Sequence, residues 1–446
     1  MSFRQTDDFD TSPEQLWAWL SRPGAIHRLM PPWQPITVVR EAANLRDGRA
    51  QLRVLGLPWT ARHDPSGYIE GSRFVDELLV PVPGFLPLPT VVPWRHEHTL
   101  EASPTGVNMT DEVSTPAPGA LLDGIFRYRT RQVRDDLAAH RRYSATPLTV
   151  AVTGTNGMIG TALTALLSTG GHRVIKLVRK ASGGDTLEQR VWDPAAPTPE
   201  LFADVDAVVH LAGAPILGRF TEGHKQKVRD SRVGPTKLLA RAASAAGVST
   251  FVSGSAIGFY GADRGDEELP ETAGRGTGFL ADVVADWEAD AVDGVGPDTR
   301  LVRVRTGVVL SPAGGMLRLL YPMFAAGLGG PLGDGKQWFS WISLDDMVEL
   351  LLRAVTDPEL SGPINAVAPH PVRYSEFAHT LGKVLHRPAI LPVPSLGPQV
   401  LLGREGAEEF AQADQRVVAA KLSDAGHHYR HPTIDVALAH LLGKAD

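Results

Sequence analysis

The chain of 446 residues is long enough for two or three domains, and its 43% hydrophobic and 21% charged residues are typical of a globular protein rather than a disordered one. A net charge of −6, without any run of Lys or Arg, argues against nucleic acid as a partner. Because the sequence has no cysteine, disulfides, thiolate chemistry and cysteine-ligated metals are excluded.

The sequence contains no recognisable targeting or membrane-spanning segment. Residues 1–10 lack the apolar core of a signal peptide, and no stretch approaches the length of a membrane span. We therefore expect a cytoplasmic protein with no membrane partner.

Residues 1–145 are predicted to form a first domain of α+β type. Ser12 is the expected N-cap of a helix that begins at Pro13 and continues to residue 20. Six extended runs follow, separated by turn residues as in an antiparallel meander: 36–40, 50–55, 59–63, 73–79, 96–101 and 106–113. A long helix over 119–142 has an apolar stripe that includes Leu122, Phe126 and Val133.

This succession of elements resembles the START/polyketide-cyclase-like helix-grip fold. The residues that carry the resemblance are Phe9-Asp10-Thr11-Ser12-Pro13, Trp17, Phe126-x-Tyr128-Arg129 and Asp135-Asp136-Leu137. The resemblance implies an apolar cavity between the sheet and the long helix, able to hold a lipid-like or polyaromatic ligand.

Aromatic and histidine side chains in this segment leave two interpretations open. Four aromatic residues either line such a cavity or belong to the core: Trp33, Trp59, Phe85 and Trp94. His96 and His98 lie on one face of a strand, but a metal needs at least one more donor. We therefore predict no metal site.

The stretch 148–180 organises the rest of the chain. A β-branched strand over 148–152 is followed by a glycine-rich turn, a helix that continues to residue 167, and a second strand over 173–178. The residues of the turn are Gly154, Thr155, Asn156, Gly157, Met158, Ile159 and Gly160. The first glycine permits the tight turn, the second lets the backbone approach a pyrophosphate, and the third lets the helix pack on the strand. Free amide groups at the helix N-terminus then face the phosphates, so the pattern predicts a dinucleotide site.

Residues at the ends of the next strands indicate which dinucleotide binds. Arg179 and Lys180 occupy the place where an NAD site usually carries an acidic residue, and a guanidinium suits a 2′-phosphate. We therefore favour NADP over NAD, although a solvated basic pair is the alternative. Leu211, Ala212 and Gly213 end a buried strand, where small residues let the backbone lie close to the ribose and nicotinamide half of the cofactor.

Five motifs in 148–446 resemble the extended short-chain dehydrogenase/reductases, and more narrowly their atypical nucleoside-diphosphate-sugar epimerase-like branch. They are TGTNGMIG at 153–160, HLAGAPI at 210–216, SRVGPT at 231–236, SGSAIGFYG at 253–261 and GGPLGDGKQWFSWISLDD at 329–346. The resemblance implies a second domain over 146–446, with a Rossmann-type doubly wound parallel sheet and a small C-terminal substrate lobe over about 390–446. It also implies a small-molecule substrate and pairing of two chains as a homodimer.

The catalytic residues of that superfamily are only partly present. Ser255 matches the substrate-orienting Ser, whereas Phe279 and Val283 stand where the Tyr and Lys should be, and neither can move a proton. Tyr260, with Arg264 four residues on, is either a substitute phenol or a structural residue of the loop. Further candidate contacts for an anionic or aromatic ligand are Arg303, Arg305, Lys336, Gln337 and Trp338.

Two functions therefore remain open. The first is an NADP-dependent oxidoreductase or epimerase that uses Ser255 and Tyr260. The second is a catalytically degenerate protein that senses NADP(H) or carries an apolar ligand in its N-terminal cavity.

Overall fold

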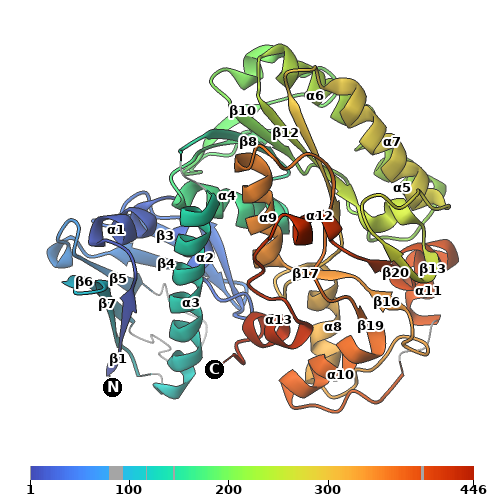
Figure 1. The fold of residues 1–446 in the computed structure, drawn as a ribbon. Coiled ribbons are helices and arrows are strands. Elements are labelled where there is room, and N and C mark those ends of the chain that lie inside the picture. The colour runs from blue at the N-terminus through green and yellow to red at the C-terminus, as the bar shows by residue number, and fades with distance from the viewer. Residues whose placement is uncertain (1, 80–93, 117, 144–145, 393–395, 446) are drawn as a thin grey trace.

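The computed structural model describes residues 2–79, 94–116, 118–143, 146–392 and 396–445. It contains two seven-stranded sheets, an antiparallel sheet near the N-terminus and a parallel sheet, each with its own helices (Figure 1). The predicted α/β class, with a doubly wound sheet preceded by an α+β part, is confirmed.

The antiparallel sheet has the strand order β1-β7-β6-β5-β4-β3-β2. Its strands are β1 (Ser2–Phe9), β2 (Ile36–Arg40), β3 (Arg49–Val54), β4 (Leu57–His63), β5 (Arg73–Leu79), β6 (Arg95–Ser103) and β7 (Gly106–Ser114). Helices α1 (Pro13–Ser21) and α2 (Ala25–Leu29) follow β1, and the long helix α3 (Ala120–Tyr143) follows β7. Ser12 caps α1 by accepting a hydrogen bond from the backbone N–H of Gln15, as predicted.

Strand β1 is the element that the sequence did not predict. It pairs with β7 over its whole length, from Ser2 opposite Ser114 to Phe9 opposite Val107. Its inward positions include Gln5 and Asp7, which bond to Thr130 of α3. Because these inward residues are polar, the usual alternation of apolar and polar residues is hidden in the sequence.

The parallel sheet has the order β10-β9-β8-β11-β12-β14-β18. Its strands are β8 (Thr149–Thr153), β9 (Arg173–Val178), β10 (Glu188–Val191), β11 (Ala207–His210), β12 (Thr250–Ala256), β14 (Arg300–Thr306) and β18 (Gly362–Ala366). Val150 and Val152 pack into one buried cluster and Ala151 into another on the opposite face. Helices cover both faces, so the central strands β8 and β11 are buried and mainly apolar, whereas β10 at the edge is mainly polar and β14 carries three arginines.

On one face lie α4 (Met158–Thr169) and α9 (Leu344–Thr356), and on the other lie α6 (Pro235–Ala245) and α7 (Phe279–Gly294) (Figure 1). The other helices are α5 (Glu222–Asp230), α8 (Gly315–Ala325), α10 (Tyr374–Leu385), α11 (Leu396–Gly406), α12 (Ala420–Asp424) and α13 (Ile434–Leu441). Three two-stranded sheets complete this part: β13 (Asp263–Leu269) with β20 (Asp414–Val417), β15 (Val308–Leu310) with β17 (Trp341–Ser343), and β16 (Trp338–Phe339) with β19 (Val372–Arg373).

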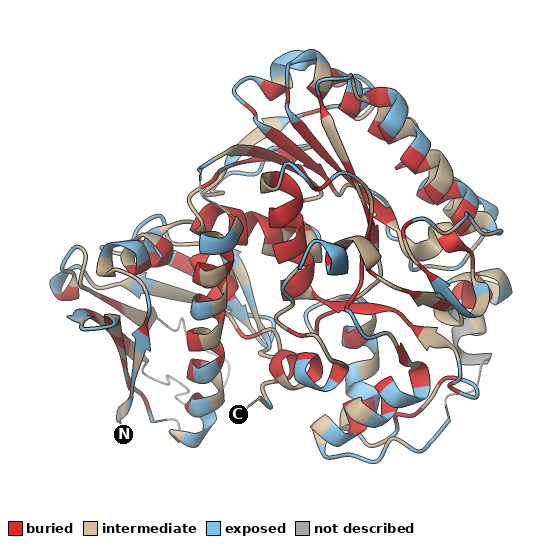
Figure 2. Cartoon of the chain, in the orientation of Figure 1, coloured by how far each residue is buried: buried red, intermediate tan, exposed pale blue. Residues whose placement is uncertain are grey.

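The two parts meet where α2 packs on α4 and α3 packs on α9. Every residue of α9 from Asp345 to Val355 is buried, as the red colour of this helix shows in Figure 2. Arg28 of α2 forms a buried ion pair across the junction with Asp345 of α9 at 2.9 Å, and it also pairs with Asp136 of α3, on its own side, at 2.7 Å. Arg430 adds a further pair to Asp136 at 2.9 Å. The two crossing pairs favour one orientation of the two parts, because separation would leave the buried charges of Asp345 and Arg430 without these partners.

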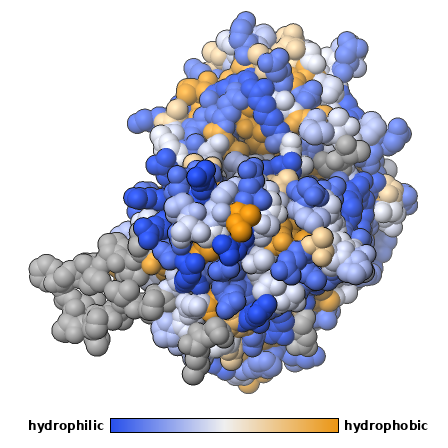
Figure 3. Space-filling view, turned by 90° about the vertical axis from the view of Figure 1, so that its left-hand side faces the viewer, coloured by the Kyte–Doolittle hydropathy of each residue, from blue (hydrophilic) through white to orange (hydrophobic). Residues whose placement is uncertain are grey.

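The predicted boundary after residue 145 falls next to positions outside the described residues. Helix α3 ends at Tyr143 and strand β8 begins at Thr149. The face shown in Figure 3 is mostly hydrophilic outside its grey atoms, with hydrophobic residues in small separate groups. Across the described ranges, none of the helices is both long and apolar enough to cross a bilayer.

Candidate functional site

The glycine-rich turn joins β8 to α4 at the carboxyl end of the parallel sheet. Gly154 has a φ of +71°, and a Cβ on it would lie 2.8 Å from the carbonyl carbon of Leu211. A Cβ on Gly160 would lie 2.2 Å from the carbonyl oxygen of Gly154, so only glycine lets the helix approach the turn this closely. Helix α4 begins after Gly157, and no side chain among the described residues caps its first turn. Its first amide groups therefore remain available to an anion.

The turn lies at the point where the strand order reverses. Numbered along the chain from β8, the sheet begins 3-2-1-4-5-6, the order of doubly wound dinucleotide-binding sheets, and the reversal falls between β8 and β11. Thr153 pairs with His210, and His210 pairs with Ser253, so the ends of β8, β11 and β12 lie side by side. Ligands of such sheets bind in the crevice beyond these strand ends.

The backbone after β11 is fixed next to the glycine turn. The Thr153 hydroxyl accepts hydrogen bonds from the N–H groups of Leu211 at 3.0 Å and Ala212 at 3.1 Å. A Cβ on Gly213 would lie 2.9 Å from the guanidinium carbon of Arg232. The residues predicted to flank the cofactor therefore lie along the same edge as the turn.

Arg179 and Lys180 follow β9, which is the neighbour of β8 on the other side of the turn. Both are exposed, and neither makes an ion pair or a side-chain hydrogen bond with any residue that the structure describes. Lys176, inside β9, is instead paired with Asp185 at 2.6 Å. The two basic side chains at the strand end are thus free to meet an anionic group.

Ser255 and Tyr260 are joined by a buried polar network. The Ser255 hydroxyl donates to Glu288 Oε1 at 2.6 Å, and Arg305 donates to both oxygens of the same carboxylate at 2.7 and 2.9 Å. Arg305 also donates to the Tyr260 hydroxyl at 2.9 Å, and that hydroxyl donates to Asn365 Oδ1 at 2.7 Å. The Tyr260 side chain is 0% exposed. In this arrangement its hydroxyl is bonded to the side chains of Arg305 and Asn365.

The hypothesis that Arg264 is the cation beside the Tyr260 phenol is therefore wrong. Arg264 donates to the backbone oxygen of Tyr260 and pairs with Glu267, whereas Arg305 is the guanidinium at the phenol. Burial raises the pKa of Tyr260, and nearby Arg305 only partly offsets it, so the phenol stays protonated at neutral pH. Arg305, a candidate ligand contact, is buried and donates to Glu288, Tyr260 and the backbone oxygen of Glu271.

The helix where the superfamily places its Tyr and Lys is α7. Phe279 begins this helix, and its ring packs edge-on against Phe220 with centroids 5.8 Å apart. Val283 is buried at 1% exposure. Neither position offers a proton-transfer group, as the sequence indicated.

A cleft of 1130 Å³ lies between the two parts of the molecule and borders the turn. Thr155, Asn156, Gly157 and Met158 line it on the side of the parallel sheet, and α2 and β2 line it on the other. Helix α8 adds Arg318 and Tyr321, which sequence analysis missed. The sequence feature that could have identified them is the i, i+3 spacing of two polar residues on an otherwise apolar helix. Tyr321 as a whole is 36% exposed.

A separate cavity of 440 Å³ lies inside the N-terminal part. Trp59 and Trp94 line it, as the cavity interpretation predicts, whereas Trp33 packs against Tyr128 at the junction and Phe85 lies outside the described residues. This cavity and the cleft share five lining residues: Met30, Pro31, Gln34, Ile36 and Glu41. The two spaces therefore adjoin.

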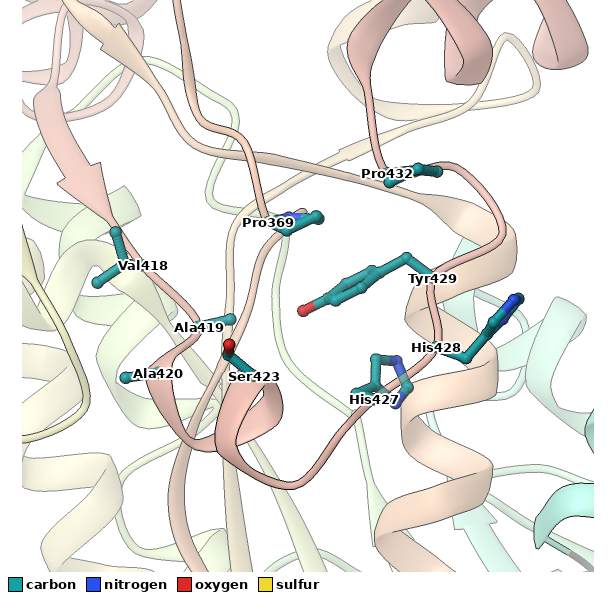
Figure 4. A pocket seen from close by; sticks show the side chains of 9 residues that line it. All are labelled: Pro369, Val418, Ala419, Ala420, Ser423, His427, His428, Tyr429 and Pro432. Atoms are coloured by element: carbon teal, nitrogen blue, oxygen red, sulfur yellow. The ribbon is translucent and has the colours of Figure 1, made fainter.

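A further pocket of 540 Å³ lies in the C-terminal segment, between residues 418–432 and Pro369 (Figure 4). Its Tyr429 hydroxyl donates to the backbone oxygen of Val367, directly after β18. Strand β18 is four positions from β8 in the sheet, so this pocket is remote from the glycine turn.

The strand order, the glycine turn and the open helix N-terminus define a doubly wound dinucleotide-binding fold. Residues 150–367 match the NAD dependent epimerase/dehydratase family, and residues 393–441 match a domain of unknown function (DUF1731). An epimerase family protein of Mycobacterium bovis is 43% identical over 294 residues, which cover 65% of this chain and 96% of the relative. The human epimerase family protein SDR39U1 is 35% identical over 66% of this chain and 99% of its own length. The chain belongs to the NAD dependent epimerase/dehydratase family.

Two solved structures resemble this chain. A nucleoside-diphosphate sugar epimerase from Corynebacterium glutamicum has a TM-score of 0.83 and 41% identity, and the match covers 99% of this chain and 90% of that one. Human SDR39U1 with NADPH has a TM-score of 0.60 and 35% identity, covering 66% of this chain and 99% of that one. The match to the Corynebacterium protein extends through the N-terminal part as well as the parallel sheet.

Proposed function

We propose that this chain binds NADP(H) along the carboxyl edge of its parallel sheet, with the diphosphate at the N-terminus of α4. The observation that carries the proposal is the uncapped start of α4 at the switch point, packed so closely on the turn that a Cβ at Gly160 would lie 2.2 Å from the Gly154 oxygen. In this proposal Gly154 to Gly160 hold the diphosphate, and Leu211 to Gly213 flank the ribose and nicotinamide half. The human relative whose structure contains NADPH supports a nicotinamide cofactor.

The choice of NADP over NAD rests on Arg179 and Lys180. Their positive charges are exposed and unused by the described part of the protein, at the strand end where a ribose 2′-phosphate would lie. A guanidinium forms paired, charge-assisted hydrogen bonds with a phosphate. In this proposal both residues contact the 2′-phosphate.

The reaction that we propose first is hydride exchange with a small molecule, as an NADP-dependent oxidoreductase or epimerase. Ser255 and Tyr260 would then act as positioning residues, because their hydroxyls are held by Glu288 and Arg305. Tyr321 on α8 would be the phenol that a substrate in the cleft can reach, with Arg318 beside it. Within this proposal, residues 1–145 and 146–446 are separate domains, and the segment over about 390–446 belongs to the substrate lobe.

The burial of Ser255 and Tyr260 favours a second candidate, a cofactor-sensing or ligand-carrying protein without turnover. The N-terminal part would act as a START/cyclase-like helix-grip domain whose 440 Å³ cavity holds an apolar ligand. Because this cavity adjoins the cleft, the ligand would lie beside the cofactor rather than apart from it.

Turnover distinguishes the two candidates. The full chain is incubated with NADPH and a panel of carbonyl compounds and nucleotide sugars, and the absorbance of the reduced nicotinamide is followed. The enzyme hypothesis predicts a substrate-dependent loss that Tyr321→Phe lowers strongly and that Tyr260→Phe lowers to a smaller extent, as expected of a positioning residue. Tight NADPH binding without turnover across the panel supports the carrier, and failure of NADPH to bind overturns both candidates. The homodimer and the cytoplasmic location remain predictions, the first of which light scattering checks.

A further inference from the structure

Two histidines of β6 lie between two aspartates at the wall of the N-terminal cavity. His96 and His98 are 3% and 2% exposed, and their ring centroids are 3.8 Å apart. On one side, Asp111 Oδ1 of β7 lies 2.8 Å from His96 Nε2 and 2.8 Å from His98 Nδ1. Asp111 is 1% exposed, and its carboxylate faces the outer nitrogen of each ring, with a hydrogen bond to His96 Nε2.

The inner nitrogens converge on a second carboxylate. Asp76 of β5 stands opposite His96 in the sheet register, and its Oδ1 lies 3.4 Å from His96 Nδ1 and 3.3 Å from His98 Nε2. One ligand atom from each of these three residues lies within 4.8 Å of the others. Asp76 is the third donor that the sequence pattern lacked, because it comes from the neighbouring strand.

We propose that Asp76, His96 and His98 bind a divalent transition-metal ion, such as zinc, with Asp111 orienting the two imidazoles. Zinc binds His nitrogen and carboxylate oxygen at about 2.0–2.2 Å, so two ligands of a tetrahedral ion lie roughly 3.3–3.5 Å apart. The two separations to Asp76, 3.4 and 3.3 Å, have this spacing. A carboxylate on the far nitrogen of a metal-bound His is the usual outer-shell partner, since it fixes the tautomer and raises ligand basicity.

The composition of the cluster also fits a dication. Asp111, His96 and His98 are 1%, 3% and 2% exposed, so these side chains are shielded from water. An M²⁺ ion balances the two carboxylates of Asp76 and Asp111 when both imidazoles are neutral, so the occupied site would carry no net charge.

The site opens onto the cavity, whose other walls include Leu52, Phe74 and Trp59. Three protein ligands leave at least one coordination position for water or for an oxygen of a cavity ligand. The cavity would then accept a mainly apolar molecule that carries one metal-binding polar group. This inference does not depend on NADP(H) binding.

The test uses the full chain, freed of metal with a chelator and then dialysed. Zn²⁺ is titrated by calorimetry, bound zinc is counted by elemental analysis, and Co²⁺ is added separately to record its absorption spectrum. We expect one ion per chain, a tetrahedral Co²⁺ spectrum, and a melting temperature that rises with Zn²⁺. Asp76→Asn and His98→Ala should lose the ion, and the exposed His379→Ala on α10 should retain it.

Asp111→Asn tests whether Asp111 orients the two imidazoles. This variant keeps all three residues that are proposed to bind the metal ion. It should still bind one Zn²⁺ ion, with an affinity about 10–100-fold lower. Each variant is first shown to be folded by circular dichroism and by a cooperative melting transition. The proposal is overturned if the folded wild-type chain binds no Zn²⁺, or if Asp76→Asn and His98→Ala bind it as the wild type does, since zinc would then lie elsewhere.

Discussion

Gly160→Ala tests the close approach of α4 to the glycine turn. The added Cβ would lie 2.2 Å from the Gly154 oxygen, 2.8 Å from the Gly154 carbonyl carbon and 2.9 Å from the Thr155 Cα, all of them backbone atoms. An ordinary contact of roughly 3.4 Å requires the turn or the helix to shift by about 1 Å, an overpacking strain of about 1–3 kcal/mol. A displacement of that size moves the first amides of α4 away from the diphosphate. We expect NADPH affinity to fall about 10–100-fold, which corresponds to roughly 1.4–2.8 kcal/mol.

The assay is calorimetric titration of NADPH into wild type and variant, beside urea denaturation of each. Gly223→Ala is the matched control, because Gly223 also lies in a helix but a Cβ on it would have no atom within 4 Å. This control should keep wild-type affinity and gain about 0.5–1 kcal/mol of stability, since Ala favours the helix. A folded Gly160→Ala variant that binds NADPH within about twofold of wild type would refute the reasoning.

The remaining predictions concern the junction, the network, pH and cofactor choice. Arg28→Met removes the buried cation shared by Asp136 and Asp345, leaving Asp136 with Arg430 and Asp345 with His440, and should lower the free energy of unfolding by about 3–5 kcal/mol in urea titrations. Tyr260→Phe removes a hydroxyl bonded on both sides and should lower it by about 1–3 kcal/mol. Burial lowers the pKa of His210 to about 4 from 6.5, so the unfolded chain binds more protons in this range, and stability should fall as pH drops from about 6.5 towards 4. His210→Gln should make that fall smaller. Arg179→Ala should weaken NADPH binding about tenfold and leave NADH binding unchanged.

Each of these four predictions has a control variant or a result that would contradict it. Arg62→Met removes a solvent-exposed ion pair with Glu77 and should lower the free energy of unfolding by no more than about 1 kcal/mol. If Arg28→Met lowers the free energy of unfolding by no more than this control, the stabilising role of the buried Arg28 pairs is contradicted. An unchanged melting temperature in Tyr260→Phe would show that its hydroxyl bonds contribute nothing. If the stability of His210→Gln falls between pH 6.5 and 4 in the same way as that of the wild type, His210 does not contribute to the pH dependence of stability. Equal weakening of NADPH and NADH by Arg179→Ala would reject the 2′-phosphate role.

Much of the fold follows from local sequence patterns. The strand–turn–helix–strand order of 148–180 predicted β8, α4 and β9, because glycines and β-branched runs encode these elements within a few residues. The antiparallel strands β2 to β7 were predicted from turn residues and extended runs. Strand β1 was missed because its inward Gln5 and Asp7 are polar, and their partner Thr130 lies more than a hundred positions away.

The site was harder to predict than the fold because its contacts join distant segments. Arg305 reaches Tyr260 across 45 positions, whereas the nearer Arg264 turns to the backbone and Glu267. Asp76 meets His96 and His98 only through the pairing of β5 with β6. Arg318 and Tyr321 border the cleft because α8 packs beside the turn. Such proximities depend on strand order and register, which no short motif specifies.

The central claim is that the uncapped start of α4 receives the diphosphate of NADP(H). Calorimetric titration of the full wild-type chain with NADPH, and separately with NADH, tests it most directly. The account predicts one NADPH per chain, bound more tightly than NADH. Absence of heat from both nucleotides at millimolar concentration would contradict it.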